Sequence, residues 1–143
     1  MLSIFLDTNV VIDIISRREP YYHTSVKLMP LLMEDKVRFI IAECSMANLF
    51  YFSYDTYKVE NASAKLLTFV SACEIAHGGK DMILNALNSA FKDKEDALQY
   101  FTALNTKAEY FITRNTGDYK HAIHSLPVYT PAQFAHLIDS KSL

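Results

Sequence analysis

The feature that most constrains the fold of this chain is a short apolar segment at its start, Leu2–Leu6, which ends abruptly at Asp7. Both alternating sets of positions in the segment are apolar except for Ser3, a pattern typical of a strand buried on both faces of a parallel sheet. Open α/β sheets carry their functional groups just beyond the carboxyl ends of the strands, where Asp7 falls. Two interpretations are open for Asp7: it begins a metal or phosphoryl site, or it caps the next helix.

Segments with strand character alternate with helical segments along the rest of the chain. We predict strands at 2–6, 37–41, 75–77, 110–113 and 128–129, and helices at 10–15, 20–35, 43–57, 61–72, 80–91, 95–107 and from Pro131 onward. Pro30 predicts a kink or a break within the second helix. The spacing of Thr130 and Gln133 around Pro131 predicts a capping box for the last helix. Strands regularly separated by helices indicate an α/β fold with a parallel sheet.

Length and composition limit the class of protein. A chain of 143 residues is long enough for one domain and too short for two ordinary ones, so we expect a single domain over residues 1–143. The net charge of −2 argues against a standing basic surface for nucleic acid, although a bound divalent cation would offset a local acidic cluster. No stretch is apolar for long enough to span a membrane, and no signal peptide precedes the first strand. Cys44 and Cys73 lack metal-ligand spacing, so we expect free thiols and a cytoplasmic protein.

Two further acidic stretches lie in the second half of the chain. Asp93-Lys94-Glu95-Asp96 directly precedes a predicted helix, and helix capping by Asp93 explains it as readily as a functional site does. The stretch from Asn115 to Asp118 follows the strand at 110–113, where turn chemistry is the simple explanation. It nevertheless repeats the arrangement of the opening, a strand followed by an acid, and this repetition favours a site at the sheet edge.

Three segments taken together resemble the PIN domain family: Leu6–Asp13, Glu95–Leu98 and Ile112–Asp118, in the family's order. The resemblance extends from near residue 2 to about residue 135. It implies a three-layer α/β/α sandwich with a central, mostly parallel sheet. It also implies a ribonuclease that depends on Mg²⁺ or Mn²⁺, frequently the toxin of a bacterial toxin–antitoxin pair, with RNA as substrate, an antitoxin as partner and a homodimer as assembly.

The family usually brings four acids together, and two of these positions hold Asn in this chain. The first and third acids correspond to Asp7 and Asp96, whereas Asn48 and Asn115 stand at the second and fourth positions. A branch of the family that resembles this sequence carries such Asn residues. Asp118, three residues after Asn115, is the candidate to replace a missing charge. Another acid, Glu43, lies near the second position but points about 140° away from Asn48 on a helix, so we do not assign it.

These residues suit magnesium chemistry. Mg²⁺ takes oxygen ligands, keeps several waters and needs only one or two protein carboxylates beside substrate phosphates. We therefore predict Asp7, Asp96 and Asp118 as metal ligands, with Asn48 and Asn115 as neutral members of the catalytic site. A metal there would lower the pKa of a bound water and neutralise charge during attack on phosphorus. The loss of two negative charges predicts a weaker or Mn²⁺-preferring nuclease, which tight binding of two Mg²⁺ ions without substrate would contradict.

Polar neighbours of the acids have predicted supporting roles. Thr8 and Asn9 would orient the loop behind Asp7, and Thr113 would do the same near Asn115. For Arg114 two interpretations stay open, a contact to an RNA phosphate or simple solvation at the surface. The aromatic segment Leu49–Tyr54, with Tyr57 beyond it, is too aromatic to bury on one helix face. We expect its remainder to form a dimer seam or a groove for a partner helix.

Two rival functions belong to other classes. A catalytically silent PIN-like module that binds RNA or protein is favoured by the two Asn replacements. An aspartate-nucleophile phosphatase would use Asp7, since such enzymes also place their acid after the first strand. They usually need a second acid two residues later, and Asn9 occupies that position.

Overall fold

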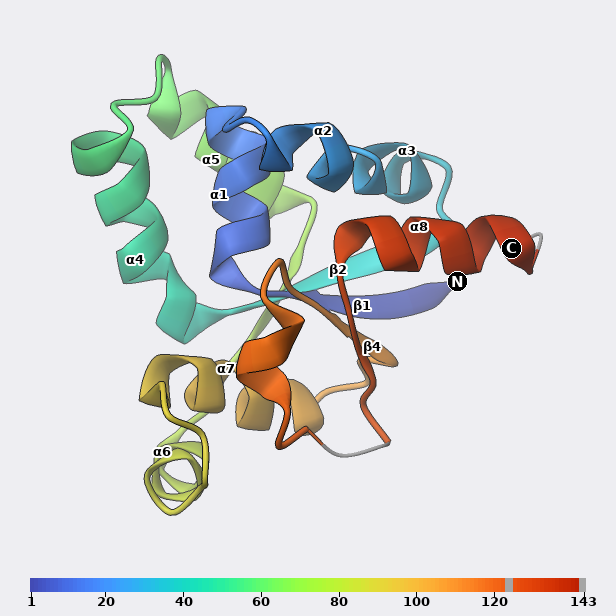
Figure 1. The fold of residues 1–143 in the computed structure, drawn as a ribbon. Coiled ribbons are helices and arrows are strands. Elements are labelled where there is room, and N and C mark those ends of the chain that lie inside the picture. The colour runs from blue at the N-terminus through green and yellow to red at the C-terminus, as the bar shows by residue number, and fades with distance from the viewer. Residues whose placement is uncertain (123–124, 142–143) are drawn as a thin grey trace.

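Five parallel strands form one sheet in the order β3-β2-β1-β4-β5 in the computed structural model, which describes residues 1–122 and 125–141 (Figure 1). The strands are β1 Leu2–Leu6, β2 Val37–Ala42, β3 Glu74–Ala76, β4 Tyr110–Ile112 and β5 Val128–Tyr129. In the register of the central pair, Leu6 lies beside Ile112, so β1 and β4 end level with each other. The predicted parallel sheet is therefore confirmed, and the residues that follow these two strands meet at one edge.

Both faces of β1 are covered, which explains why its sequence is apolar at consecutive positions. Ile4 and Leu6 contact one core cluster, whereas Phe5 contacts the other, and all three side chains are fully buried. The neighbouring strand repeats the alternation, with Phe39 on the first face and Ile40 on the second. A strand in the middle of a parallel sheet has no solvent face, and burial of both sets of side chains holds its register.

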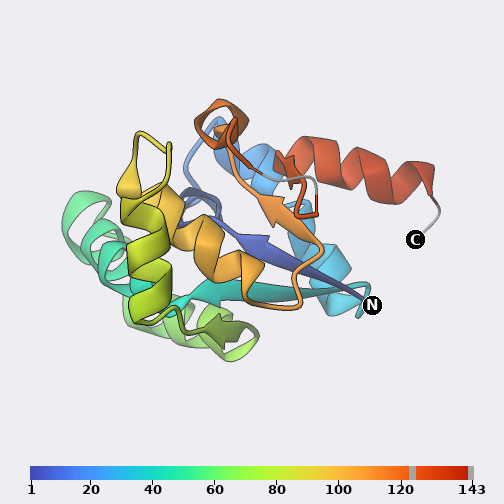
Figure 2. The ribbon, with the colours of Figure 1, turned by 90° about the horizontal axis from the view of Figure 1, so that it is seen from below.

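Helices lie on both faces of the sheet and complete three layers (Figure 1). One face carries α1 Thr8–Ser16, α2 Tyr21–Ser25, α3 Leu28–Met33, α4 Met46–Phe50, α5 Ala62–Ser71 and α8 Pro131–Ser140. The other face carries α6 Lys80–Leu87 and α7 Lys94–Leu104, which lie in front of the strands when the sheet is viewed from below (Figure 2). The α/β/α sandwich implied by the resemblance is confirmed. Among the described residues, no helix has both the length and the apolar character needed to cross a membrane.

The helix predicted for 20–35 is two helices, and the break is not at Pro30. Val26 and Lys27 separate α2 from α3, one turn earlier than predicted. Pro30 is the third residue of α3, where backbone N–H groups have no partner within the helix in any case. Proline therefore removes no hydrogen bond at this position and is compatible with the first turn.

Three other helical predictions need smaller corrections. The helix predicted for 43–57 is a 3₁₀ turn η1 Glu43–Ser45, then α4, then a π-helical segment η2 Tyr51–Thr56. Helices α6 and α7 end a few residues earlier than predicted. Beyond them, Ser89 donates its hydroxyl to the carbonyl of Ala86, and Thr106 donates to that of Ala103. Such side chains satisfy the last carbonyls of a helix and compete with its continuation.

Candidate active site

Asp7 directly follows β1, at the point where the sheet passes into α1. Its backbone N–H donates to the carbonyl of Ile112 at 2.9 Å, which ties it to the end of β4. Asp7 occupies the position before the first residue of α1, but its side chain makes no capping hydrogen bond. Instead, the carboxylate points toward residues from other elements. The capping interpretation of Asp7 therefore does not describe what its side chain contacts.

Three side chains donate hydrogen bonds to the Asp7 carboxylate. Gln99 Nε2 lies 3.0 Å from Oδ1, whereas Thr113 Oγ1 and Tyr119 Oη lie 2.7 and 2.9 Å from Oδ2. Asp7 is only 3% exposed, and this burial raises its pKa; the three side-chain hydrogen bonds and one from the backbone of Asn9 offset part of the rise. Asp7 is therefore a buried carboxyl group that its hydrogen-bond donors hold in one orientation.

The amide of Gln99 has a defined orientation. Its Oε1 accepts from the backbone N–H of Thr8 at 3.1 Å and lies 3.3 Å from the Thr8 hydroxyl, so its NH₂ group faces Asp7. Thr8 thus orients Asp7 indirectly, through Gln99, which lies on α7 and is distant from both residues in the sequence. This connection was not predicted, although Gln99 lies one helical turn after Asp96 and hence on the same side of α7.

Asp96 brings a second carboxyl group to this region from the first turn of α7. The predicted cap of this helix is confirmed, because Asp93 Oδ1 accepts from the backbone N–H groups of Glu95 at 2.8 Å and of Asp96 at 3.1 Å. The Asp96 side chain is therefore free for another role. Burial, followed by the negative charges of Asp7, Asp93 and Asp118, raises the pKa of Asp96 to about 7, against an opposing hydrogen bond from Tyr119. Like-charge repulsion of this kind indicates a cluster of carboxylates.

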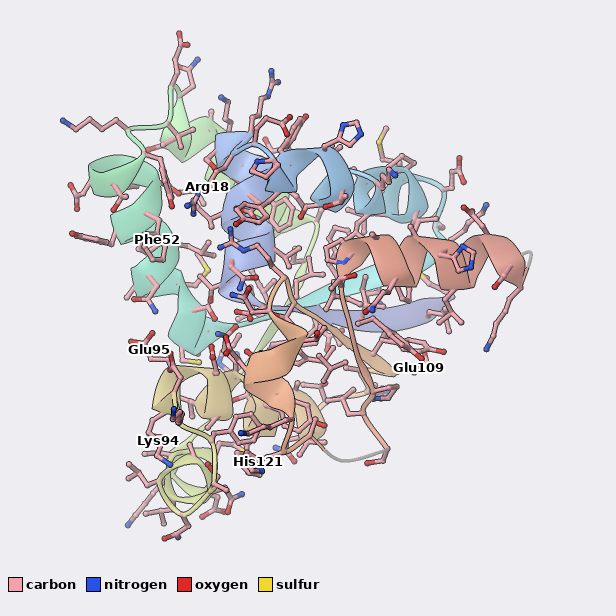
Figure 3. The ribbon with its side chains drawn as sticks, viewed as in Figure 1. Arg18, Phe52, Lys94, Glu95, Glu109 and His121 are labelled. Atoms are coloured by element: carbon pink, nitrogen blue, oxygen red, sulfur yellow. The ribbon has the colours of Figure 1, made fainter. Side chains whose placement is uncertain are left out.

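A cleft of about 160 Å³ opens over these two acids. Asn48 on α4 and Glu95 on α7 join Asp7 and Asp96 along its wall, and Asn48 Nδ2 lies 3.3 Å from Glu95 Oε2. Glu95 lies at the start of α7, on the side that faces the segment after β2 (Figure 3). The sequence analysis treated Glu95 only as a favourable charge at a helix start, and its contact with Asn48 is the new information.

The other predicted site residues occupy different places. Asn115 and Asp118 are exposed, in or beside the 3₁₀ turn η3 Thr116–Tyr119, and neither lines the cleft. Asp118 is nevertheless close enough for its charge to raise the pKa of Asp96. Tyr119, the next residue, is buried and contacts Asp7, a role that the sequence analysis missed.

Residues predicted to support the loops make the local contacts that such a role requires. Thr113 is fully buried, and its hydroxyl both donates to Asp7 and accepts from the backbone N–H of Asn115 at 3.3 Å. Asn9 accepts from the backbone N–H of Arg114 through Oδ1 at 3.4 Å. Glu43, which we did not assign, contacts His77 and lies outside the cleft.

The donor set suits one divalent cation better than several. Within residues 1–122 and 125–141, no three His, Cys, Asp or Glu side chains are arranged to hold a metal, so the predicted trio with Asp118 is not preformed. Asp7, Asp96 and the amide of Asn48 supply two carboxylates and one neutral group, which is enough for Mg²⁺ or Mn²⁺ with waters. The raised pKa of Asp96 fits this assignment, because a cation would offset the repulsion by neighbouring carboxylates that causes part of the rise.

Fold and cleft together define a class: an α/β/α domain whose acids converge where β1 and β4 end and α7 begins. The sequence model of the PIN domain matches residues 3–117, and the chain therefore belongs to the PIN domain family. It is similar to "Ribonuclease VapC1" of Aquifex aeolicus (strain VF5), with 25% identity over 129 residues that cover 87% of this chain and 89% of that protein.

Solved structures with the same fold include complexes of two proteins. VapBC2 from Rickettsia felis, bound to a DNA fragment from their promoter, has a TM-score of 0.66 at 20% identity, over 90% of this chain and 98% of that one. A toxin–antitoxin complex from Klebsiella pneumoniae has a TM-score of 0.64 at 22% identity, over 90% and 97% of the two chains. At these identities the likeness establishes the fold, and it agrees with the family assignment.

Proposed function

We propose that this chain is a metal-dependent ribonuclease that hydrolyses RNA phosphodiester bonds and serves as the toxin of a toxin–antitoxin pair. The observation that carries the proposal is the meeting of Asp7 and Asp96 in one cleft, where burial raises both pKa values and the charge of Asp7 adds to the rise at Asp96. Perturbed carboxyl groups in a cleft are typical of catalytic sites. Membership of the PIN domain family and the similarity to a protein named as a ribonuclease support the same reaction.

Each residue of the cleft has a part in this proposal. Gln99, Thr113 and Tyr119 hold Asp7 in one orientation, so its carboxylate would bind a cation without reorganisation. Asp96 provides the second carboxylate, and Asn48 provides a neutral oxygen or holds a water. A bound Mg²⁺ or Mn²⁺ would supply a water of lowered pKa and neutralise charge at phosphorus. We keep Asp118 and Asn115 as predicted members of the site, at its exposed rim.

The test is cleavage of a mixed panel of RNAs by the purified chain with Mg²⁺, with Mn²⁺ and with EDTA. Cleavage is expected with the metals, strongest with Mn²⁺, and absent with EDTA. Asp96→Asn is expected to abolish it. Asp93→Asn is the matched control and is expected to keep cleavage, because Asp93 lies outside the cleft and Asn caps a helix as well as Asp does. Loss of the Asp93 charge removes one cause of the raised pKa of Asp96 and leaves the Asp96 carboxyl in place.

One result of this experiment would contradict the nuclease proposal. A folded preparation, free of any partner, that cleaves no RNA under these conditions would favour the silent RNA- or protein-binding module. The absence of a preformed three-ligand metal cluster among the described residues is the observation that favours this second candidate. The phosphatase alternative is weaker, because three donors already occupy the Asp7 carboxylate, two of them on one oxygen.

The partner part of the proposal rests on the exposed aromatic side chains after β2. Phe50, Tyr51 and Tyr54 are 48, 59 and 46% exposed, so the predicted surplus of aromatic side chains is on the surface. We propose that an antitoxin or a second copy of the chain covers this patch in the cytoplasm.

Expression of the chain alone in a bacterial host tests the toxin role. Growth is expected to stop, and to recover with Asp96→Asn or when the product of a small neighbouring reading frame is co-expressed and purifies with the chain. Unimpaired growth at a verified level of active, RNA-cleaving chain would contradict the toxin role while leaving the nuclease intact.

A further inference from the structure

The cleft over the acids also has a cationic wall. Arg18, just beyond α1, and Arg114, just beyond β4, line the same cleft as Asp7 and Asp96. In Figure 3 the side chain of Arg18 extends toward Phe52, and Glu95 lies at the far side of the same region. An acidic cluster alone would repel a nucleic acid. The metal site therefore does not explain why two guanidinium groups line the same cleft.

Arg114 is held by an ion pair with a buried carboxylate and by contact with an aromatic ring. Its side chain is 20% exposed, and Nε lies 3.7 Å from Oδ2 of the fully buried Asp13, too far for a hydrogen bond. The guanidinium carbon lies 3.9 Å from the centre of the Tyr21 ring. Neither carboxylate oxygen of Asp13 nor Nε of Arg114 has a hydrogen-bond partner in the described part of the chain. Arg114 is therefore positioned by stacking and by a buried counter-charge. Because Nε is itself buried, the terminal nitrogens are the donors that would reach a ligand.

Arg18 is positioned by the same aromatic side chains. It donates a hydrogen bond to the Tyr57 hydroxyl, and its guanidinium carbon lies 5.1 Å from the Tyr57 ring centre and 5.6 Å from that of Tyr21. Tyr21 thus contacts both arginines and keeps two like charges near each other. Contact with aromatic faces fixes a guanidinium group without neutralising it.

The charges around Arg18 and Arg114 and their distance from the acids indicate which ligand they bind. Asp13 is acted on by the charges of both Arg18 and Arg114, so the two cations share this one buried carboxylate. Along a helix with a rise of 1.5 Å per residue, the backbone of Arg18 lies roughly 15 Å from that of Asp7. The backbone of Arg18 is therefore set back from Asp7, whereas Arg114 directly follows Thr113, which contacts Asp7. The two arginines thus extend away from the acids along the cleft, and its Arg18 end can hold a phosphate other than the one that is cleaved.

We propose that Arg18 and Arg114 form a second phosphate subsite for single-stranded RNA, which binds a backbone phosphate next to the one that is cleaved. The proposal rests on the proposed function for its substrate class. Asp13 and Tyr21 position the two guanidinium groups, whose planar donors match phosphate oxygens. A protein carboxylate from a partner would bind the two guanidinium groups in a similar way. RNA is favoured because the acids in the same cleft would hold the metal that acts on a phosphate, whereas they would only repel an acidic peptide.

The salt dependence of RNA binding tests the subsite. All proteins carry Asp96→Asn so that the RNA is not consumed, and a fluorescein-labelled 12-nucleotide RNA of mixed sequence is the probe. Removing one phosphate contact to a single strand lowers the slope of log K against log salt by about 0.7. Arg18→Gln and Arg114→Gln are each expected to show this change and to weaken binding by about fivefold to tenfold. Arg17→Gln is the matched control, since Arg17 is adjacent but lines a different groove, and it should change neither quantity.

Three further results test whether Arg18 and Arg114 form a phosphate subsite. Arg18→Lys keeps the charge and is expected to keep the slope of the parent, which separates the charge from the packing of the side chain. Unchanged slopes in both Gln variants, or an equal change in Arg17→Gln, would overturn the subsite. An acidic peptide that binds the parent and loses affinity in the Gln variants, while RNA binding is unaffected, would overturn it in favour of a protein partner. Because binding is measured without cleavage, a failure here differs from failure of the nuclease proposal.

Discussion

Replacing Asp7 by Asn is expected to reduce RNA cleavage by roughly 100- to 1000-fold, the size of effect that follows loss of one preorganised electrostatic contact at a transition state. The substitution keeps the shape of the side chain and removes its charge. Thr113 and Tyr119 both donate to Oδ2 in the native site, and an amide nitrogen there would face two hydroxyl donors. These hydroxyls must rotate, but removal of a buried charge compensates, so the chain should still fold.

Cleavage rates and thermal melting of the same preparations check this prediction. Tyr119→Phe is the matched comparison, because it removes one of the three donors and keeps the carboxylate. Groups that orient a metal-binding side chain typically contribute about 10- to 100-fold, so this variant should be clearly less impaired than Asp7→Asn. If Asp7→Asn kept more than a tenth of the native rate while folded, Asp7 could not be a metal-binding carboxylate in the reaction.

The position of Asp7 was predictable because it depends on chain order and on the sheet alone. An apolar segment buried on both faces must be a central strand, and the residue after it must lie at the carboxyl edge. The same reasoning predicted a strand at 110–113 and so placed Thr113 at its carboxyl end, although β4 ends one residue earlier, at Ile112. The break near Val26 was not predictable in this way, because the tolerance of Pro30 depends on where α3 begins, and α2 and α3 are too short for a clear periodicity.

The contacts of Gln99 and Tyr119 could not be derived from local sequence. Each contacts Asp7 across more than 90 positions of the chain, and only the packing of α7 and η3 against the sheet brings them there. The acidic set was predicted from the resemblance, and the structure separates its members by depth: Asp7 is buried, Asp96 is half-buried and Asp118 is exposed. Depth of burial follows from the three-dimensional arrangement, so the sequence placed these acids in one region without ranking them.

Mg²⁺ or Mn²⁺ is expected to raise the melting temperature more at pH 8 than at pH 6. The pKa of Asp96 is raised from 3.8 to about 7, so the folded chain holds this proton more tightly than the unfolded chain does. Ionisation of Asp96 therefore lowers stability progressively as the pH rises from about 4 to 7, and the full loss is present above 7. Asp13, whose pKa is raised to about 6, acts in the same direction.

A cation and a proton compete for Asp96, and this competition sets the size of the effect. At 100 times its dissociation constant a ligand adds about 2.7 kcal/mol to stability, or roughly 5–10 °C in a domain of this length. One pH unit below its pKa only about a tenth of a carboxyl group is ionised, so binding at pH 6 should be about tenfold weaker. Thermal scans with EDTA and with each metal at both pH values measure the difference.

The difference between the two pH values reports on the acids that line the cleft. Asp13 does not line the cleft, so most of its contribution is common to the scans with and without metal. The pKa of Asp7 is also raised, so Asp7 changes the metal-induced shift in the same direction as Asp96. Asp96→Asn is expected to remove most of the shift and most of its pH dependence. An equal shift at both pH values in the native chain would place the cation away from Asp96, and the pair of acids would then no longer be the metal site.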